Sequence, residues 1–398
     1  MRSTTAGVER RFYTQLEENC MGMTRVWYRS CAVLMTAVAL ALTAGCHSEG
    51  ERVPLTEQKI YVSDKFFDVA VMDPQRALVI GYGGKILETT DGGFTWAQIA
   101  SGTDKALYSV DFTDDGQTGF IVGESGLLLK SIDSGKSWAQ QEVVVWLDSE
   151  CNDPEERRFR ELDDPCQYAY LFAVSVIDKD NVALIGDKSI YARSRDGGAT
   201  WEVETLKFED EDIDPDMALA FEDPVLYDIE FLDVKNGYIV GEFGKIYHTT
   251  DGGESWEQQQ ESMMDETVFD ILDLPTLFDV DFNGPDNGIV VGLDGRIAVT
   301  TDGGKDWNFV LNNVDDYIDP FYSATILDDG TRWVVGASGQ VVMAQGDQQF
   351  ARGDLGSAVN SWMRRVRFVD DKHGWLVGGF GLVMSTDDGG KTWYRRIG

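Results

Sequence analysis

Acidic residues occupy the positions of this chain at which chemistry could take place. Six copies of the motif Ser/Thr-x-Asp-x-Gly-x-x-Trp each place one carboxylate at a fixed distance from a tryptophan. The six carboxylates are Asp91, Asp133, Asp196, Asp251, Asp302 and Asp388. Paired carboxylates can act as acid and base, but six equivalent sites on one rim converge on no common substrate. Short acidic side chains also accept backbone N–H groups in turns. We therefore interpret these Asp residues as structural, each fixing one hairpin.

Other residue types that support catalysis are sparse and scattered. The three histidines are His47, His248 and His373, and they lie in different repeats or outside them. Such spacing gives neither a metal-ligand cluster nor a catalytic triad. We expect no metal, no cofactor and no enzymatic activity.

The motifs are spaced as a repeat, and the repeat predicts the elements that position them. The six motif tryptophans lie 42, 63, 55, 51 and 86 residues apart, and the last interval is long enough for two units. A seventh unit is recovered there, with its motif reduced to AQGDQQF at 344–350. Each unit reads as four short strands, with a Gly-x-x-Gly turn between the second and the third. The first glycines of these turns are Gly81, Gly123, Gly186, Gly241, Gly292, Gly336 and Gly378.

Seven units of four short strands have the proportions of an all-β, seven-bladed β-propeller. The glycine two residues after each motif Asp permits a positive φ. We expect the motif Trp to be buried against its own blade or the next one. Two segments are candidates to close the ring, the amino-terminal residues 56–62 and the final WYRRI at 393–397.

The innermost strands predict a polar channel at the axis of the propeller. Alternation along each strand places one set of side chains opposite the aromatic and branched ones. This set contains Asp68, Ser109, Asp111, Ala173, Ser175, Asp228, Glu230, Asp279, Asp281, Ser323, Thr325, Arg365 and Arg367. We expect Arg365 and Arg367 to neutralise part of a ring of carboxylates, with Arg364 near its mouth. A cation such as Ca²⁺ bound by these oxygens is the alternative to solvated structural carboxylates.

The amino terminus has the pattern of an export signal. An apolar run at 31–42 follows Arg25 and Arg29 and ends in Leu42-Thr43-Ala44-Gly45-Cys46. This resembles a bacterial lipoprotein signal, which implies cleavage before Cys46 and lipid on its thiol. An ordinary secreted protein cut near Ala44 is the alternative.

The chain then divides into three parts. Residues 1–45 are a signal with an extra amino-terminal extension, 46–52 a lipidated tether, and 53–398 the propeller. Since His47, and not Asp, follows the lipidated cysteine, the resemblance suggests an outer-membrane lipoprotein facing the periplasm. The short tether would hold the propeller close to the lipid surface.

Only Cys151 and Cys166 remain for pairing once the signal is removed and Cys46 carries lipid. An even pair in an exported protein predicts a disulfide, with free thiols as the alternative.

Charge limits the possible partners. The formal net charge is −35, with 69 acidic against 34 basic residues. This excess argues against nucleic acid, whose binding requires a basic face. It also disfavours direct adsorption to anionic lipid, so contact with the membrane is expected through the lipid anchor alone.

Long insertions follow the fourth strands and precede the next first strands, at 142–170, 202–226, 257–277 and 308–321. In a propeller these links share one face with the Gly-x-x-Gly turns, and functional loops on rigid scaffolds gather in this way. We predict that a protein partner binds there and at the channel mouth, with solvated decoration as the alternative for any single loop. The predicted contact residues are Glu209, Asp210, Glu211, Asp212, Asp214, Asp216, Arg364, Arg365 and Arg367.

The units from 66 to 393 resemble the photosystem II assembly and stability factor-like family of BNR-repeat (Asp-box) propellers. The resemblance is clearest in FLDVKNGYIVGE at 231–242 and FVDDKHGWLVGG at 368–379. It implies a non-catalytic propeller that binds polypeptides during assembly of membrane complexes. The acidic insertions depart from the basic surface expected of its photosynthetic members.

Sialidases and other glycoside hydrolases share the Asp motif and are the alternative class. Their chemistry requires a suitably placed pair of acids, and sialidases also require arginines from several blades. Here the arginines predicted at the channel come from one unit only.

Overall fold

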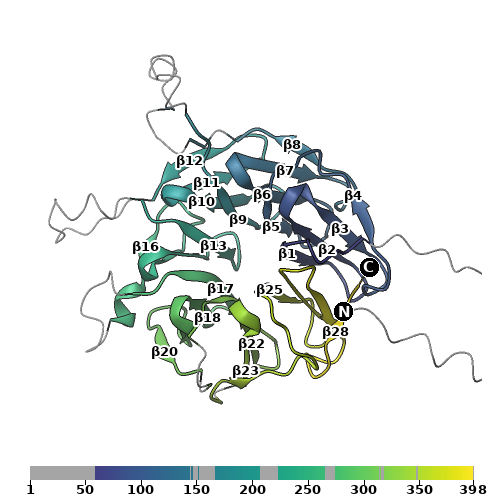
Figure 1. Ribbon diagram of the computed structural model, residues 1–398. Coiled ribbons are helices and arrows are strands. Elements are labelled where there is room, and N and C mark those ends of the chain that lie inside the picture. The colour runs from purple at the N-terminus through teal and green to yellow at the C-terminus, as the bar shows by residue number, and fades with distance from the viewer. Residues whose placement is uncertain are drawn as a thin grey trace, which may run out of the picture. The chain divides into compact units, whose positions relative to one another are not determined.

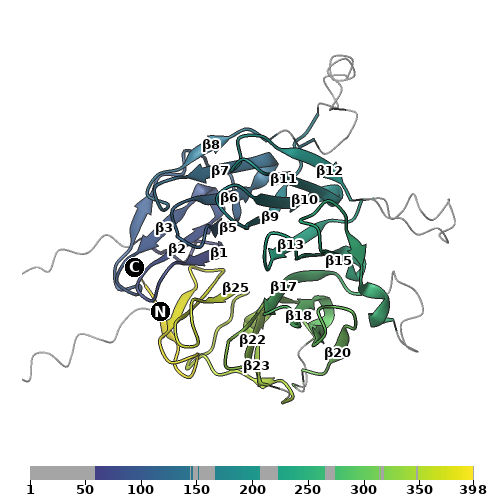
Figure 2. The ribbon, with the colours of Figure 1, turned by 180° about the vertical axis from the view of Figure 1, so that it is seen from behind.

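The computed structural model describes residues 59–143, 145–146, 151, 166–206, 223–264, 274–312, 314, 318–346 and 348–397. The chain divides into two units, residues 1–57 and 58–398, and the fold described is that of the second. Within the described residues, seven antiparallel sheets of four consecutive strands surround a common axis (Figures 1 and 2). The predicted seven-bladed, all-β propeller is therefore confirmed. We number the blades one to seven in chain order.

Each blade contributes one strand to each of four concentric positions. The first, innermost strands are β1 (Phe66–Val71), β5 (Leu107–Phe112), β9 (Leu171–Val176), β13 (Leu226–Phe231), β17 (Leu277–Asn283), β21 (Phe321–Ile326) and β25 (Met363–Phe368). The second strands are β2 (Ala77–Gly81), β6 (Gly119–Gly123), β10 (Val182–Gly186), β14 (Gly237–Gly241), β18 (Asn287–Gly292), β22 (Thr331–Gly336) and β26 (Gly374–Gly378). The third strands are β3 (Ile86–Thr89), β7 (Leu127–Ser131), β11 (Ile190–Ser194), β15 (Ile246–Thr249), β19 (Ile297–Thr300), β23 (Val341–Gln345) and β27 (Val383–Thr386). The fourth, outermost strands are β4 (Ala97–Ile99), β8 (Ala139–Gln141), β12 (Glu202–Thr205), β16 (Glu257–Gln258), β20 (Asn308–Val310), β24 (Ala351–Arg352) and β28 (Tyr394–Arg395).

Short 3₁₀ turns join the second and third strands of blades one to six. They are η1 (Tyr82–Gly84), η2 (Glu124–Gly126), η4 (Asp187–Ser189), η5 (Glu242–Gly244), η8 (Leu293–Gly295) and η9 (Ala337–Gly339). A further 3₁₀ turn, η6 (Gln260–Met263), follows β16. Among the residues described, no helix has the length and apolar character needed to cross a membrane.

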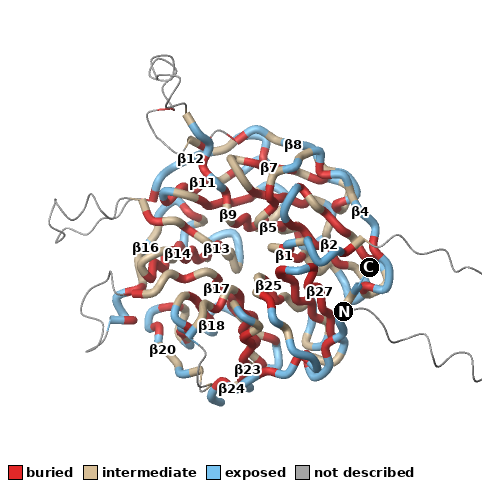
Figure 3. The backbone as a smooth tube through the Cα atoms, viewed as in Figure 1, coloured by how far each residue is buried: buried red, intermediate tan, exposed pale blue. Residues whose placement is uncertain are grey.

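The strand order gives the disc two different faces. The turns between second and third strands lie on one face, together with the links from each fourth strand to the next first strand; we call it the link face. The Asp-motif turns and the turns between first and second strands lie on the other, which we call the staple face. Burial falls outwards from the second strands, which are buried throughout in most blades, to the largely exposed fourth strands (Figure 3).

The motif Asp residues staple the hairpins as predicted. In blade one, Asp91 Oδ1 accepts the N–H of Thr95 at 2.9 Å, and the N–H of Gly93 donates to the Thr89 hydroxyl at 2.8 Å. Gly93 has a φ of +89°, which a residue with a side chain rarely adopts. The other five motifs repeat the Asp bond.

Of the two placements expected for the motif Trp, packing on its own blade is confirmed and packing on the next blade is wrong. The rings pack on their own blade and the preceding blade, not the following one. Trp256 in blade four contacts Tyr191 of blade three at 5.3 Å between ring centroids and Phe231 of its own blade at 5.9 Å. Trp393 likewise contacts Trp333 of blade six at 5.7 Å. Each Trp therefore seals the seam behind it.

The glycine that ends each second strand is required by a close approach between neighbouring chain segments. A Cβ on Gly81 would lie 2.1 Å from the carbonyl oxygen of Lys65, just before the inner strand of the same blade. Equivalent contacts of 2.0–2.4 Å occur at the other six glycines. Any side chain here would force the second strand away from the first.

The ring is closed by the carboxyl-terminal segment, since β28 pairs with β27 in blade seven. Residues 59–65 form no strand, but the carbonyl of Asp64 accepts the N–H of Gly381 at 2.9 Å. Ile60 is 3% exposed within the apolar cluster between blades seven and one. The amino-terminal segment thus covers the seam without adding a strand.

Replacing Trp307 with Ala should lower the free energy of unfolding by about 3–5 kcal/mol, because this ring is 1% exposed and packed at the seam between blades four and five. Urea denaturation followed by tryptophan fluorescence measures the change. Phe94→Ala is the control: its side chain is 76% exposed, so a loss of no more than about 0.5 kcal/mol is expected. Equal losses for the two variants would contradict the assignment.

Candidate functional site

Every inner strand carries a β-bulge at its second residue. In blade one the register with β2 shifts between Phe66 and Asp68, which leaves Phe67 unpaired, and the other six blades repeat this shift. The unpaired residues are Phe67, Tyr108, Phe172, Tyr227, Phe278, Tyr322 and Arg364. All seven are partly exposed. A bulge redirects a side chain out of the regular alternation.

The six aromatic members form a continuous arc at the start of the inner strands, on the link face. Consecutive ring centroids from Phe67 to Tyr322 are 5.0–5.5 Å apart. We call these six residues the aromatic arc. Arg364 takes the seventh place, and its Nη1 donates to the carbonyl of Tyr322 at 3.0 Å. Burial and the neighbouring Arg365 lower the pKa of Arg364 below its ordinary value.

Sequence reasoning missed this arc, because it assigned the aromatic residues to the side opposite the channel. The available signal was an aromatic residue at the second position of six of the seven inner strands.

The third residues of the inner strands bond one blade to the next. Asp68 Oδ2 accepts the N–H of Val110 in blade two at 2.9 Å. Asp279 Oδ2 accepts that of Ala324 in blade six at 2.7 Å. Asp228, Ser109 and Ser323 make the same bond across their own seams. These side chains therefore act as bridges between sheets that share no strand pairing.

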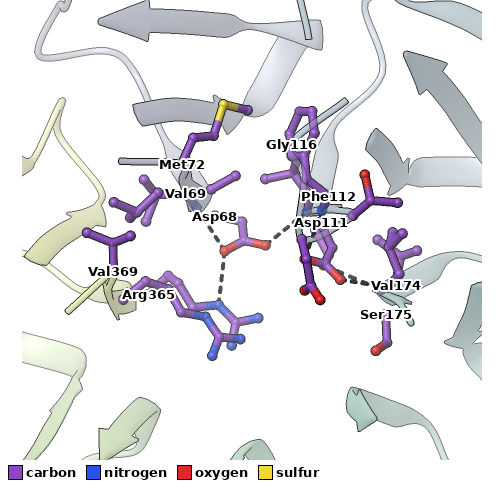
Figure 4. Close-up of a pocket in the computed structure, with 18 of the residues that line it drawn as sticks. Asp68, Val69, Met72, Asp111, Phe112, Gly116, Val174, Ser175, Arg365 and Val369 are labelled. Carbon is purple, nitrogen blue, oxygen red and sulfur yellow. Dashed lines mark hydrogen bonds and ion pairs between the residues drawn. The ribbon is translucent and has the colours of Figure 1, made fainter. Parts of the chain in front are cut away.

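Arg365 supplies the positive charge for this layer (Figure 4). Its Nε lies 3.1 Å from Asp68 Oδ1 and its Nη2 lies 3.5 Å from Asp228 Oδ1, while its Nη1 bonds Asp279 Oδ1. Arg365 is 3% exposed, so it faces the ring and presents no surface to a partner. The three carboxylates raise its pKa well above the ordinary value, against the effect of burial.

The fifth residues of the inner strands form a second layer, in which fewer of the negative charges are paired with arginine. Asp111 Oδ2 accepts the N–H of Val176 at 2.6 Å, and Asp281 Oδ1 lies 3.2 Å from Arg367 Nη1. Glu230 Oε2 is buried and has no hydrogen-bond partner. Burial and the nearby Asp281 raise the pKa of Glu230 well above its ordinary value, and burial raises those of Asp111 and Asp281 to about 6.

A cavity of about 640 Å³ extends from these layers to the staple face, where Met72, Asp73 and Gly116 line it. Within the described part of the chain, no group of three His, Cys, Asp or Glu side chains is arranged to hold a metal ion. The Ca²⁺ alternative thus gains no support from the geometry.

The link face carries the insertions predicted to bind a partner. Glu209 to Asp216 and Cys46 lie outside the described residues. Cys151 and Cys166 form the predicted disulfide. At the base of the same insertion Trp146 stacks on Tyr168 at 4.2 Å, and the carbonyl of Ala169 accepts the N–H of Gly126 at 2.7 Å. The insertion is thereby held against the turn of blade two.

Arg365→Met should cost about 3–5 kcal/mol of unfolding free energy, because it leaves three buried carboxylates without their cation. The matched variant Arg367→Met removes a side chain that is 33% exposed and paired with Asp281, so its loss should be smaller. Chemical denaturation of both variants tests the order. A smaller loss for Arg365→Met would show that the ring does not depend on its charge.

Stability should fall as the pH rises from about 5 to about 7.5. Since the pKa values of Asp111, Asp228 and Asp281 are raised to about 6 in the fold, the native state binds more protons there than the unfolded chain, whose carboxyl groups titrate near pH 4. The motif residues Asp133 and Asp196 have the opposite effect on stability, because hydrogen bonds lower their pKa values to about 2. Their effect is confined to pH values below this range.

Glu230→Gln separates the contribution of the channel to this pH dependence from the general effect of net charge. The variant should raise the thermal midpoint at about pH 7.5 and reduce the difference between the midpoints at about pH 5 and about pH 7.5. Calorimetry at both pH values measures this. An unchanged pH profile in the variant would mean that Glu230 does not carry the effect.

Comparison with known proteins agrees with the family resemblance. The family model of photosynthesis system II assembly factor YCF48 matches residues 48–150 and 214–274, which contain blades one, two and four. The photosystem II assembly lipoprotein Ycf48 of Synechococcus sp. (strain CC9902) is 34% identical over 80 residues, which cover 20% of this chain and 22% of that protein. The chain thus matches about a fifth of the length of this curated relative.

Two solved structures share the fold. One is described as YCF48 bound to D1 peptide, with a TM-score of 0.60 and 19% identity, covering 81% of this chain and 92% of that chain. The other is YCF48 from Cyanidioschyzon merolae, with a TM-score of 0.60 and 16% identity, covering 82% and 96%. These two structures show the shared fold, and the resemblance seen in the sequence is confirmed by the family model and the curated relative.

Proposed function

We propose that this chain, a repeat propeller of the YCF48-like family, is a non-catalytic lipoprotein that holds polypeptide segments of a membrane complex during assembly. The family match supports the assembly role. The relative solved with D1 peptide shows that a propeller of this fold can bind a peptide. The partner is proposed to be an envelope complex, reached from a lipid anchor on Cys46 in the outer membrane, facing the periplasm.

The proposal of a non-catalytic role depends on the interactions that the carboxylates of the first channel layer already make. Asp68, Asp228 and Asp279 each bond both the backbone of the next blade and Arg365. Groups engaged in this way are not available to activate water or a substrate. Among the inner strands only β25 carries arginine, whereas the sialidase alternative requires arginines from several blades.

Binding is proposed on the link face, where residues 207–222 of the link between β12 and β13 contain seven acidic residues and one lysine. The proposed contacts are Glu209, Asp210, Glu211, Asp212, Asp214, Asp216 and Arg364. Arg367 lines the cavity that opens on the staple face, so we propose no link-face contact for it. Acidic loops on a tethered disc would attract basic segments over about one Debye length, roughly 8 Å at physiological salt.

Replacing the six acidic residues of 209–216 with Ser and Asn should abolish co-purification of the partner while changing the thermal midpoint little. The measurement uses a tag after Gly398 and detergent-solubilised membranes, with bound proteins identified by mass spectrometry. Asp114→Asn combined with Asp387→Asn, two exposed residues of the staple face, is the control and should retain the partner. Loss of the partner in the control as well would indicate general charge attraction. Hydrolysis of sialosides or glucans by the purified protein would refute the non-catalytic role.

A further inference from the structure

Three acidic residues border the aromatic arc on consecutive blades. Glu124, Asp187 and Glu242 are the first residues of η2, η4 and η5, and each of these turns lies against the inner strand of the following blade. One oxygen of each carboxylate accepts a backbone N–H just before the inner strand of its own blade. The donors are Ala106 at 3.1 Å, Tyr170 at 2.9 Å and Val225 at 3.0 Å. The carboxylates are therefore held in place beside the arc.

Their charge reaches the rings. The pKa of Tyr108 is raised to about 12, mainly by burial of the ring and in addition by the negative charges of Glu124 and Asp187. The pKa of Tyr227 is also raised, mainly by burial and in addition by the negative charges of Glu242 and Asp187. The pKa of Asp187 itself is raised by burial and by the charge of Glu242. This part of the link face therefore has a negative potential that a bound cation would relieve.

Aromatic surface extends outward from the arc at the same place. The ring of Tyr170 lies 6.4 Å from Tyr108 and 6.3 Å from Phe172, and it is 39% exposed. Tyr168, also partly exposed, continues this surface to the base of the disulfide-closed insertion. A row of partly exposed aromatic rings bordered by carboxylates is the arrangement that attracts guanidinium and ammonium groups.

Few basic residues of the link face lie beside the rings of blades two to four. Arg364 lies in blade seven, where it bonds the carbonyl of Tyr322, and it lowers the pKa of Tyr227 less than Glu242 and Asp187 raise it. Lys65 lies over Tyr82 in blade one. Lys105 donates to the carbonyl of Ser125 at 3.1 Å. Lys188 is exposed next to Asp187 in η4. A further lysine on the link face of blades two to four, Lys245, is buried and donates to Gln258 Oε1 at 2.9 Å. The three carboxylates therefore outnumber the lysines exposed beside them, and the acidic links add to the difference.

We infer that the aromatic arc over blades two to four docks a cationic, extended segment of the partner polypeptide. Arginine or lysine side chains of that segment lie over Tyr108, Phe172 and Tyr227, with Glu124, Asp187 and Glu242 as their counter-charges. The inference rests on the proposed function and specifies its partner as a basic polypeptide, in accord with the net charge of −35.

The probe is a synthetic octapeptide of alternating Arg and Leu with a benzoylphenylalanine photocrosslinker at its centre, compared with the same peptide carrying Glu in place of Arg. Calorimetry should detect binding of the arginine peptide to the intact protein and none of the glutamate peptide. Irradiation followed by mass spectrometry should place the crosslinks on peptides containing residues 108, 170–172 or 227. Crosslinks confined to other surfaces would overturn the inference.

Two double variants separate the rings from the charges. Tyr108→Leu with Tyr227→Leu keeps the net charge and should weaken binding about tenfold. Asp187→Asn with Glu242→Gln keeps an oxygen for the N–H groups of Tyr170 and Val225, and should weaken binding about threefold to tenfold and reduce its salt dependence. The control, Phe94→Leu with Asp114→Asn on the staple face, should bind within about twofold of the parent. If the ring variant binds the arginine peptide as tightly as the parent, the binding is due to general charge attraction and the inference is refuted.

Co-purification from membranes separates this inference from the proposed function. If the parent protein retains a partner and the ring variant retains it equally, the docking site is wrong while the assembly role stands. If the parent retains no partner, the proposed function fails whatever the peptide does. Loss of the partner in the ring variant, with an unchanged thermal midpoint, supports both.

Discussion

The bond from an inner-strand side chain to the backbone of the next blade is the interaction on which this propeller depends. Each sheet is complete within its own four strands, so no main-chain ladder crosses from one blade to another. Apolar packing between sheets is strong but not directional. The bonds of Asp68, Asp228 and Asp279 supply the missing direction, because each fixes the height of one inner strand against its neighbour.

Such bonds concentrate negative charge at the axis, and one blade compensates for it. The inner strand β25 has arginines at two positions where most other blades carry acids or hydroxyls. Arg365 joins carboxylates from blades one, four and five. A buried charge network of this kind is tolerated only when its members are paired. Glu230 is the member with an unpaired oxygen, and it therefore makes the second layer sensitive to pH.

The two faces of the disc consequently differ in what they can recognise. The staple face is fixed by six short hydrogen-bonded turns of nearly identical geometry. The link face combines the partly exposed aromatic arc, three oriented carboxylates and the ends of the long insertions. Because loops vary more easily than stapled hairpins, a repeat scaffold can change its partner there without altering the ring.

Periodicity in the sequence was sufficient to establish the number of blades, the four strands of each, the stapled turns and the glycine positions. These features are local: a turn and its hydrogen bonds lie within one unit, and alternation reports one strand at a time. The cysteine count likewise identified the pair Cys151 and Cys166. What required the tertiary structure was the register between paired strands and every feature that involves two units. The bulge that turns Phe67 and Tyr108 into the arc is a shift in register against a second strand. The side on which Trp256 packs depends on the twist of neighbouring sheets. The sharing of Arg365 among three blades depends on closure of the ring, since Asp68 lies 297 residues away in sequence and only the complete circle brings the two together.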